Sequence, residues 1–126
     1  MRLSDGTVAM LSAFVPEQDL RRMRVVTGPP FCWFPAGLRM AAATFGPFVM
    51  FRPGSFDTTT PNGLALIAHE AHHIRQAREM GQLWFFVRYI IGNARCHFQH
   101  DHHPLEIPAI EVQRAVYWAL QANPES

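Results

Sequence analysis

The residues His69-Glu70-Ala71-His72-His73 satisfy the pattern H-E-x-x-H, whose residue types and spacing could hold a metal ion. On a helix each residue advances by about 100°, so His69 and His73 would lie about 40° apart and one turn apart along the axis. Their imidazoles could then reach the same ion. Glu70 would lie to the side of the pair, where its carboxylate could face a water molecule on the metal without being a ligand.

That arrangement suits hydrolysis. Zinc lowers the pKa of a bound water to near neutrality and polarises a carbonyl group, while a nearby carboxylate takes the proton as the water attacks. The pattern therefore predicts a zinc site with His69 and His73 as ligands and Glu70 as general base, acting on a peptide or amide bond. The pattern also occurs in unrelated helices, but here it lies at the centre of a predicted helix in a short chain.

A catalytic zinc usually has three protein ligands, so a third is expected. The extended pattern H-E-x-x-H-x-x-G-x-x-H fails, because Gln76 and Glu79 occupy its glycine and last histidine positions. The later segment HPLEIPAIEVQ offers Glu106 and Glu111, which would diverge by about 140° on one helix. We favour Glu106, in the first turn after a loop, over Glu111 and the histidines of that loop.

The elements that must position these residues can be outlined from helix and turn signals. The helix carrying the pattern is expected from Pro61 or Asn62 to Met80, with Thr60 as its N-cap and Gly81 at its end. Other segments have the periodicity or turn residues of shorter elements. These are a helix from Pro16 to Val26, strands Arg39 to Thr44 and Phe48 to Arg52 forming a hairpin, a helix from Gln82 to about Ile91, and a final helix from Leu105 to Gln121.

The 126 residues fit one domain, residues 1–126, of the α+β class, mostly helical with a short hairpin before the histidine helix. Hydrophobic residues make up 48% of the chain and charged residues 17%, which argues against a disordered chain. The formal charge of +1 gives no broad basic field, so we expect no nucleic-acid partner. Cys32 and Cys96 do not form a C-x-x-C pair and are expected to be separate buried thiols.

Neither apolar stretch of the chain has the properties of a membrane anchor. The stretch from Thr7 to Val15 lacks a convincing cleavage site, so an export signal is weak and a cytoplasmic location is the default expectation. The run from Leu83 to Ile91 has about half the length needed to span a bilayer. Its aromatic residues, Trp84 among them, occur around much of the helix, which favours a core helix.

The remaining histidines are less specific. His72 is expected to pack beside the ligands, and the segment HFQHDHH is typical of a polar loop near the cleft. A histidine or tyrosine commonly stabilises the developing oxyanion in zinc peptidases, and His100, His103 and Tyr117 are eligible. The sequence does not choose among them.

Three segments together resemble a known family. HEAHHIRQ, followed by PLEIPAIE and preceded by AAATFGPFVMFRPGSFD, is similar to the minigluzincin-type metallopeptidases, over about residues 39–115. The resemblance implies a zincin-like fold in which a strand pair leads into the active-site helix. It also implies that His69, His73 and Glu106 bind zinc, that Glu70 is the general base, and that Gln76 is the family's glutamine beyond the second histidine.

Two functions from different classes remain open. The leading prediction is a zinc-dependent peptidase that acts on a peptide or protein substrate, with a cleft so shallow that a protein partner could complete it. The alternative is a catalytically silent, peptidase-like zinc-binding module that serves as a structural or interaction component of a larger assembly. A metal-dependent amidase acting on a cell wall or another small amide ranks third. Glu70 beside the ligands favours catalysis, because a structural zinc has no use for a base.

Overall fold

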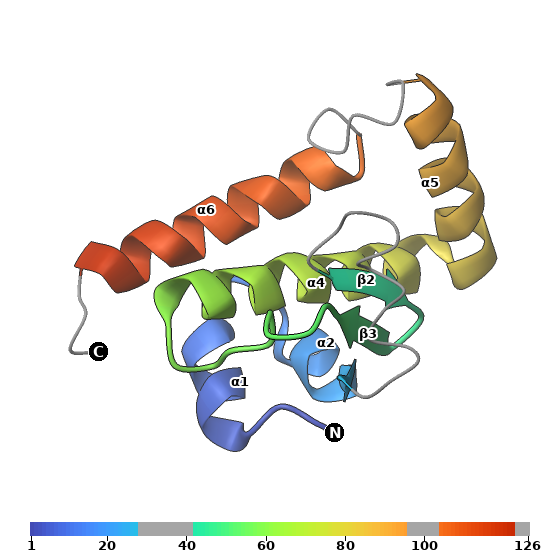
Figure 1. The fold of residues 1–126 in the computed structure, drawn as a ribbon. Helices are drawn as coiled ribbons and strands as arrows, with labels where there is room; N and C mark the ends of the chain where they lie inside the picture. The colour runs from blue at the N-terminus through green and yellow to red at the C-terminus, as the bar shows by residue number, and fades with distance from the viewer. Residues whose placement is uncertain (28–41, 96–103, 123–126) are drawn as a thin grey trace.

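The helix α4 (Pro61–Met80) runs through the centre of the molecule and carries the H-E-x-x-H pattern (Figure 1). The computed structural model describes residues 1–27, 42–95 and 104–122. Helix α4 packs against α6 (Glu106–Ala122), α5 (Gln82–Arg95), α2 (Glu17–Arg22) and α1 (Asp5–Leu11), and against strand β2 (Ala42–Phe45). Most of its residues are buried, as expected of a helix covered on several sides.

The small sheet has three strands in the order β1-β3-β2. Strands β2 and β3 (Phe48–Phe51) form the predicted antiparallel hairpin, in which Thr44 faces Val49. Gly46 has a φ of 62° at the turn, a conformation that glycine adopts without a steric penalty. The predicted α+β class and the hairpin before α4 are therefore confirmed, while residues 39–41 of the first predicted strand lie outside the described residues.

Strand β1 (Arg24–Val26) corrects the predicted helix from Pro16 to Val26. Helix α2 ends at Arg22, and the strand pairs in parallel with β3, with Val25 opposite Val49. Val25 and Val26 are β-branched and suit a pleated strand, and the partner strand is more than twenty residues away in sequence. The pairing with β3 therefore determines the conformation of this segment, in place of the helix that its local sequence predicts.

The two ends of α4 follow the predicted capping residues. The Thr60 side chain accepts a hydrogen bond from the backbone N–H of Gly63, and Gly81, with a φ of 88°, ends the helix. Pro61 occupies the first turn, where its missing N–H is harmless. Local sequence signals therefore determine where the helix with the two histidines begins and ends.

Helices α5 and α6 differ from expectation in detail. Helix α5 continues past the predicted stop at Gly92-Asn93 to Arg95, because one interior glycine costs only about 1 kcal/mol. Phe85 is buried as predicted, but Trp84 is 55% exposed, so the expected burial was wrong for that residue. Within the described residues, no helix combines the length and apolar character that crossing a bilayer requires.

One face of α6 lies against α4. Glu106, Ala109 and Val116 on this face are buried, and Val112 and Leu120 pack against the main core. The core itself is formed by apolar side chains from α1, α2, β3 and α4, including Leu11, Leu20, Phe51 and Ile67. The same packing that buries the apolar side chains of α6 thus brings Glu106 to the histidine helix.

We expect Gly63→Ala to lower the free energy of unfolding by about 2–3 kcal/mol, the usual cost of overpacking. A Cβ atom at Gly63 would lie 2.0 Å from the backbone oxygen of Asp57, so the entry into α4 would have to shift. Chemical unfolding measures the change. The control is Gly6→Ala in α1, where a Cβ meets nothing within 4 Å and stability should not fall. Equal losses in both variants would contradict the steric argument.

An ion pair between the buried carboxylate of Asp19 and the partly exposed side chain of Arg78 links α2 to the last turn of α4. Arg78 Nε and a terminal guanidinium nitrogen donate to the two carboxylate oxygens of Asp19 at 2.8 and 3.0 Å, and Asp19 is fully buried. Arg78→Ala would leave that carboxylate buried without its partner, at a cost of about 3 kcal/mol. Arg75→Ala removes the exposed pair with Glu79 on the same helix and should cost less than about 1 kcal/mol. Thermal unfolding of both variants checks this ranking, which similar midpoints would contradict.

Candidate metal centre

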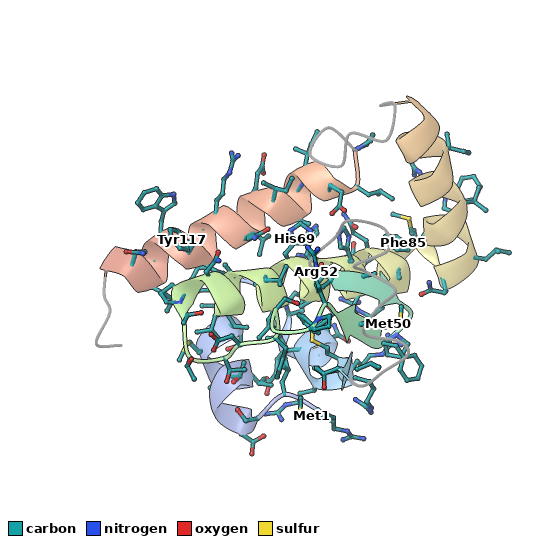
Figure 2. The ribbon with its side chains drawn as sticks, in the orientation of Figure 1. Met1, Met50, Arg52, His69, Phe85 and Tyr117 are labelled. Carbon is teal, nitrogen blue, oxygen red and sulfur yellow. The ribbon has the colours of Figure 1, made fainter. Side chains whose placement is uncertain are left out.

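The two histidines of the pattern lie side by side in the interior. His69 and His73 are 5% and 4% exposed, and their ring centroids are 5.0 Å apart. One helical turn separates them along α4, and both rings contact Glu106 of α6. Figure 2 shows His69 between α4 and α6. Phe85 of α5 packs beside the ring of His73, at a centroid distance of 6.0 Å.

Glu106, the first residue of α6, completes the group. Its Oε1 lies 2.9 Å from His69 Nε2 and 2.5 Å from His73 Nε2, and the residue is fully buried. The ligand atoms of the three residues all lie within 4.8 Å of one another, and the group could hold a metal ion. Glu111 is exposed on α6 and is not part of this group. The histidines of the loop before α6 lie outside the described residues; they are His97, His100, His102 and His103.

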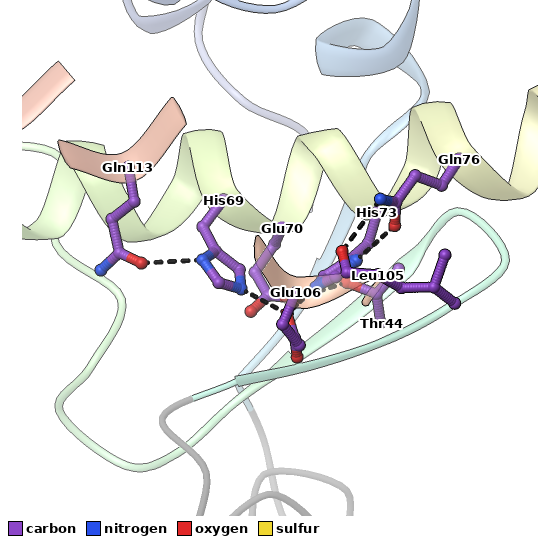
Figure 3. A network of polar contacts seen from close by, with 8 residues as sticks. All are labelled: Thr44, His69, Glu70, His73, Gln76, Leu105, Glu106 and Gln113. Atoms are coloured by element: carbon purple, nitrogen blue, oxygen red, sulfur yellow. Dashed lines mark hydrogen bonds and ion pairs between the residues drawn. The ribbon is translucent and has the colours of Figure 1, made fainter. Parts of the chain in front are cut away.

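The second ring nitrogen of each histidine, Nδ1, forms a hydrogen bond with a glutamine (Figure 3). The Oε1 atom of Gln113 accepts a hydrogen bond from His69 Nδ1 at 2.7 Å, and the Oε1 atom of Gln76 accepts one from His73 Nδ1 at 2.9 Å. An amide oxygen can only accept, so Nδ1 carries the proton in both rings. In a neutral ring, Nε2 then presents a lone pair toward Glu106.

These hydrogen bonds show that the group suits a cation. Neutral imidazoles would place two Nε2 lone pairs against a carboxylate oxygen, and a proton or a metal ion between these atoms removes that repulsion. Burial by itself would lower the pKa of His73, but the hydrogen bond and negative charge of Glu106, and then the charge of Glu70, outweigh it and raise that pKa to about 9. A metal ion can replace the proton. Two imidazoles and one carboxylate are a common zinc ligand set.

Glu70 is buried beside the group without belonging to it. It is 4% exposed, and its Oε2 accepts a hydrogen bond of 2.6 Å from the hydroxyl of Thr44 on β2. Its charge is close enough to raise the pKa of His73. The sheet therefore fixes one oxygen of this carboxylate, which leaves the other for a further partner.

Other residues that the sequence suggested do not join the site. His72 is half-buried, its Nδ1 has no hydrogen-bond partner in the described part of the chain, and burial together with His73 lowers its pKa to about 4. These features agree with the prediction that His72 is a packing residue, and they favour its neutral form. Tyr117 lies toward the far end of α6 (Figure 2), and its hydroxyl accepts a hydrogen bond from Gln121, which provides no support for an oxyanion role. Cys32 and Cys96 lie outside the described residues.

Sequence reasoning missed two polar partners, Thr44 and Gln113. No local signal distinguished Thr44 from other strand residues. Gln113 could have been found, since it lies seven residues after Glu106 and so shares its face of α6.

Comparison with known proteins gives one family. No curated protein and no solved structure matches the chain. The family model of the eCIS core domain, the core domain of the extracellular contractile injection system, matches residues 2–81. This range includes residues 2–38, which the minigluzincin resemblance left out, and it ends before Glu106. The match covers more than half of the sequence, and the chain therefore belongs to the eCIS core domain family.

Proposed function

We propose that this chain is a zinc-dependent peptidase domain of a contractile injection system component. The proposal rests on one observation, the convergence of His69, His73 and Glu106 on one buried point beside the carboxylate of Glu70. The part of the chain that the structure describes offers three ligands at this point. Three protein ligands are typical of a catalytic zinc, whereas a structural zinc normally has four.

Bound zinc would supply a Lewis acid and a water molecule acidified to near-neutral pKa. Residues of the chain would supply the proton transfers and hold the reacting groups in place. Glu70 would take the proton of the attacking water and pass it to the leaving nitrogen, because its second oxygen is not engaged by Thr44. Thr44 would hold the carboxylate in place during both transfers. The zincin-like fold implied by the minigluzincin resemblance is part of this proposal.

The second candidate is a silent zinc-binding module that acts as a structural or interaction part of the assembly. The family description favours this candidate, because it names the core domain of an injection system and no reaction. The exposed side chains of Trp84, on α5, and Trp118, on α6, would suit protein contacts. Either candidate needs the same metal centre, so they differ only in what Glu70 does.

The test is peptide cleavage by the purified chain, measured by mass spectrometry on a mixture of denatured proteins and on a cell-wall preparation. We expect cleavage of protein substrates that a chelator stops and stoichiometric zinc restores. Cleavage of the cell-wall amides alone would replace the peptidase proposal with an amidase. Bound zinc without cleavage of either substrate would favour the silent module.

A further inference from the structure

The glutamine Gln113 is the least expected contact of the metal centre. It lies on α6, two turns after Glu106, so one helix face presents both residues to the same imidazole. Glu106 faces Nε2 of His69 and Gln113 faces Nδ1, at 2.9 and 2.7 Å. The ring of His69 leaves α4 and is held between two side chains of α6 (Figure 3).

This contact has a definite chemical consequence. A neutral imidazole carries one proton, on Nδ1 or on Nε2, and only the Nδ1–H form leaves Nε2 free to bind a metal. The acceptor oxygen of Gln113 stabilises that form and fixes the plane of the ring. For His73, the acceptor is Gln76, one turn away on the same helix. Gln76 also donates to the backbone oxygen of Leu105, the residue before Glu106.

Both acceptors are neutral amides. Histidine ligands of metals often donate instead to a carboxylate, which adds negative charge and raises the basicity of the ligand. Here the carboxylates that the described residues bring to the site are those of Glu106, which faces the Nε2 atoms, and Glu70, which is held by Thr44. An amide supplies the orientation of the ring without that added charge, so a carboxylate at the same place should strengthen metal binding.

We propose that Gln113 is a positioning residue of the metal centre, which holds His69 in its metal-binding tautomer through a neutral hydrogen bond. This inference rests on the proposed zinc site but not on its catalytic role. It assigns to the middle of α6 a part in metal binding that the match over residues 2–81 does not cover. Helix α6 would thus contribute both a ligand and the group that orients another ligand.

The experiment compares zinc dissociation constants of the wild-type chain with those of Gln113→Leu and Gln113→Glu, measured by competition with a chromogenic chelator. Gln113→Leu keeps the approximate size but removes the acceptor, and zinc binding should weaken by about 10–100-fold, the usual effect of losing such a partner. Gln113→Glu keeps the acceptor and adds charge, so binding should be as tight as in the wild type or tighter. Weaker zinc binding in Gln113→Leu without weaker binding in Gln113→Glu separates positioning from packing.

The control is Gln121→Leu, which changes an exposed glutamine on the same helix whose amide donates to the hydroxyl of Tyr117. Its zinc affinity should match the wild type, and circular dichroism should show the same helix content in all variants. Three outcomes would overturn the positioning role of Gln113 while leaving the zinc site in place. These are an unchanged zinc affinity in Gln113→Leu, equal weakening in both Gln113 variants, and equal weakening in the control. A wild-type chain that binds no zinc would overturn the zinc site and this inference together.

Discussion

Glu70→Gln is expected to lower the rate of zinc-dependent peptide cleavage by about a thousandfold while the chain keeps its zinc. The change replaces one carboxylate oxygen with an amide nitrogen, so the side chain keeps its shape but can no longer accept the proton of water. Its remaining oxygen can still accept the hydrogen bond from Thr44, which preserves the contact with β2. Zinc should stay because Glu70 is not among the three converging ligands.

The control for this prediction is Glu79→Gln on the same helix. Glu79 is exposed and forms an ion pair with Arg75 at the surface, so cleavage should be unchanged. Rates are measured with zinc-loaded protein on the best substrate from the cleavage screen. Full activity in Glu70→Gln would contradict the role of general base, and loss of zinc in this variant would show that Glu70 acts as a ligand.

The second large effect is the stabilisation of the fold by zinc, which distinguishes Glu106 from Glu111 as the third ligand. Zinc at about a hundred times its dissociation constant should stabilise the wild-type fold by about 2.7 kcal/mol, which raises the unfolding midpoint by about 10 °C. Glu106→Ala should remove this shift, because the buried carboxylate is one of the three proposed ligands. Glu111→Ala should keep it, because that side chain is exposed five residues further along α6.

Differential scanning fluorimetry with and without zinc measures both variants against the wild type. The zinc-dependent shift, rather than the midpoint itself, is the relevant quantity, since removing a buried charge also changes the stability of the metal-free chain. A shift that persists in Glu106→Ala and disappears in Glu111→Ala would reverse the assignment of the third ligand.

Features with strong local chemistry could be predicted from the sequence. Thr60, Pro61 and Gly81 mark the ends of α4, since capping and helix termination depend on a few neighbouring residues. The H-E-x-x-H spacing places two histidines on one face of any helix. The position of Glu106 in a first helical turn favoured it over Glu111, and the structure brings Glu106 to the histidines.

Features that depend on distant partners could not be predicted. Strand β1 exists because it pairs with β3, and no signal within its three residues outweighs the preceding helical pattern. The contact of Thr44 with Glu70 spans 26 residues, and that of Gln113 with His69 spans 44. For Gln113, the sequence gives its place on the same helix face as Glu106 but not its partner. Such contacts follow from how the hairpin and α6 pack on α4. The sequence therefore indicated the candidate ligands but not the contacts that Thr44 and Gln113 make with the site.

The most direct test of the metal centre is elemental analysis of the chain purified without chelators, beside His73→Ala and Glu106→Ala. We expect about one zinc per wild-type chain and no bound zinc in either variant, because a site of three ligands loses its affinity when one is removed. A different divalent ion at the same stoichiometry would keep the site and change its metal. Absence of any metal from the folded wild-type chain would show that His69, His73 and Glu106 do not form a metal site.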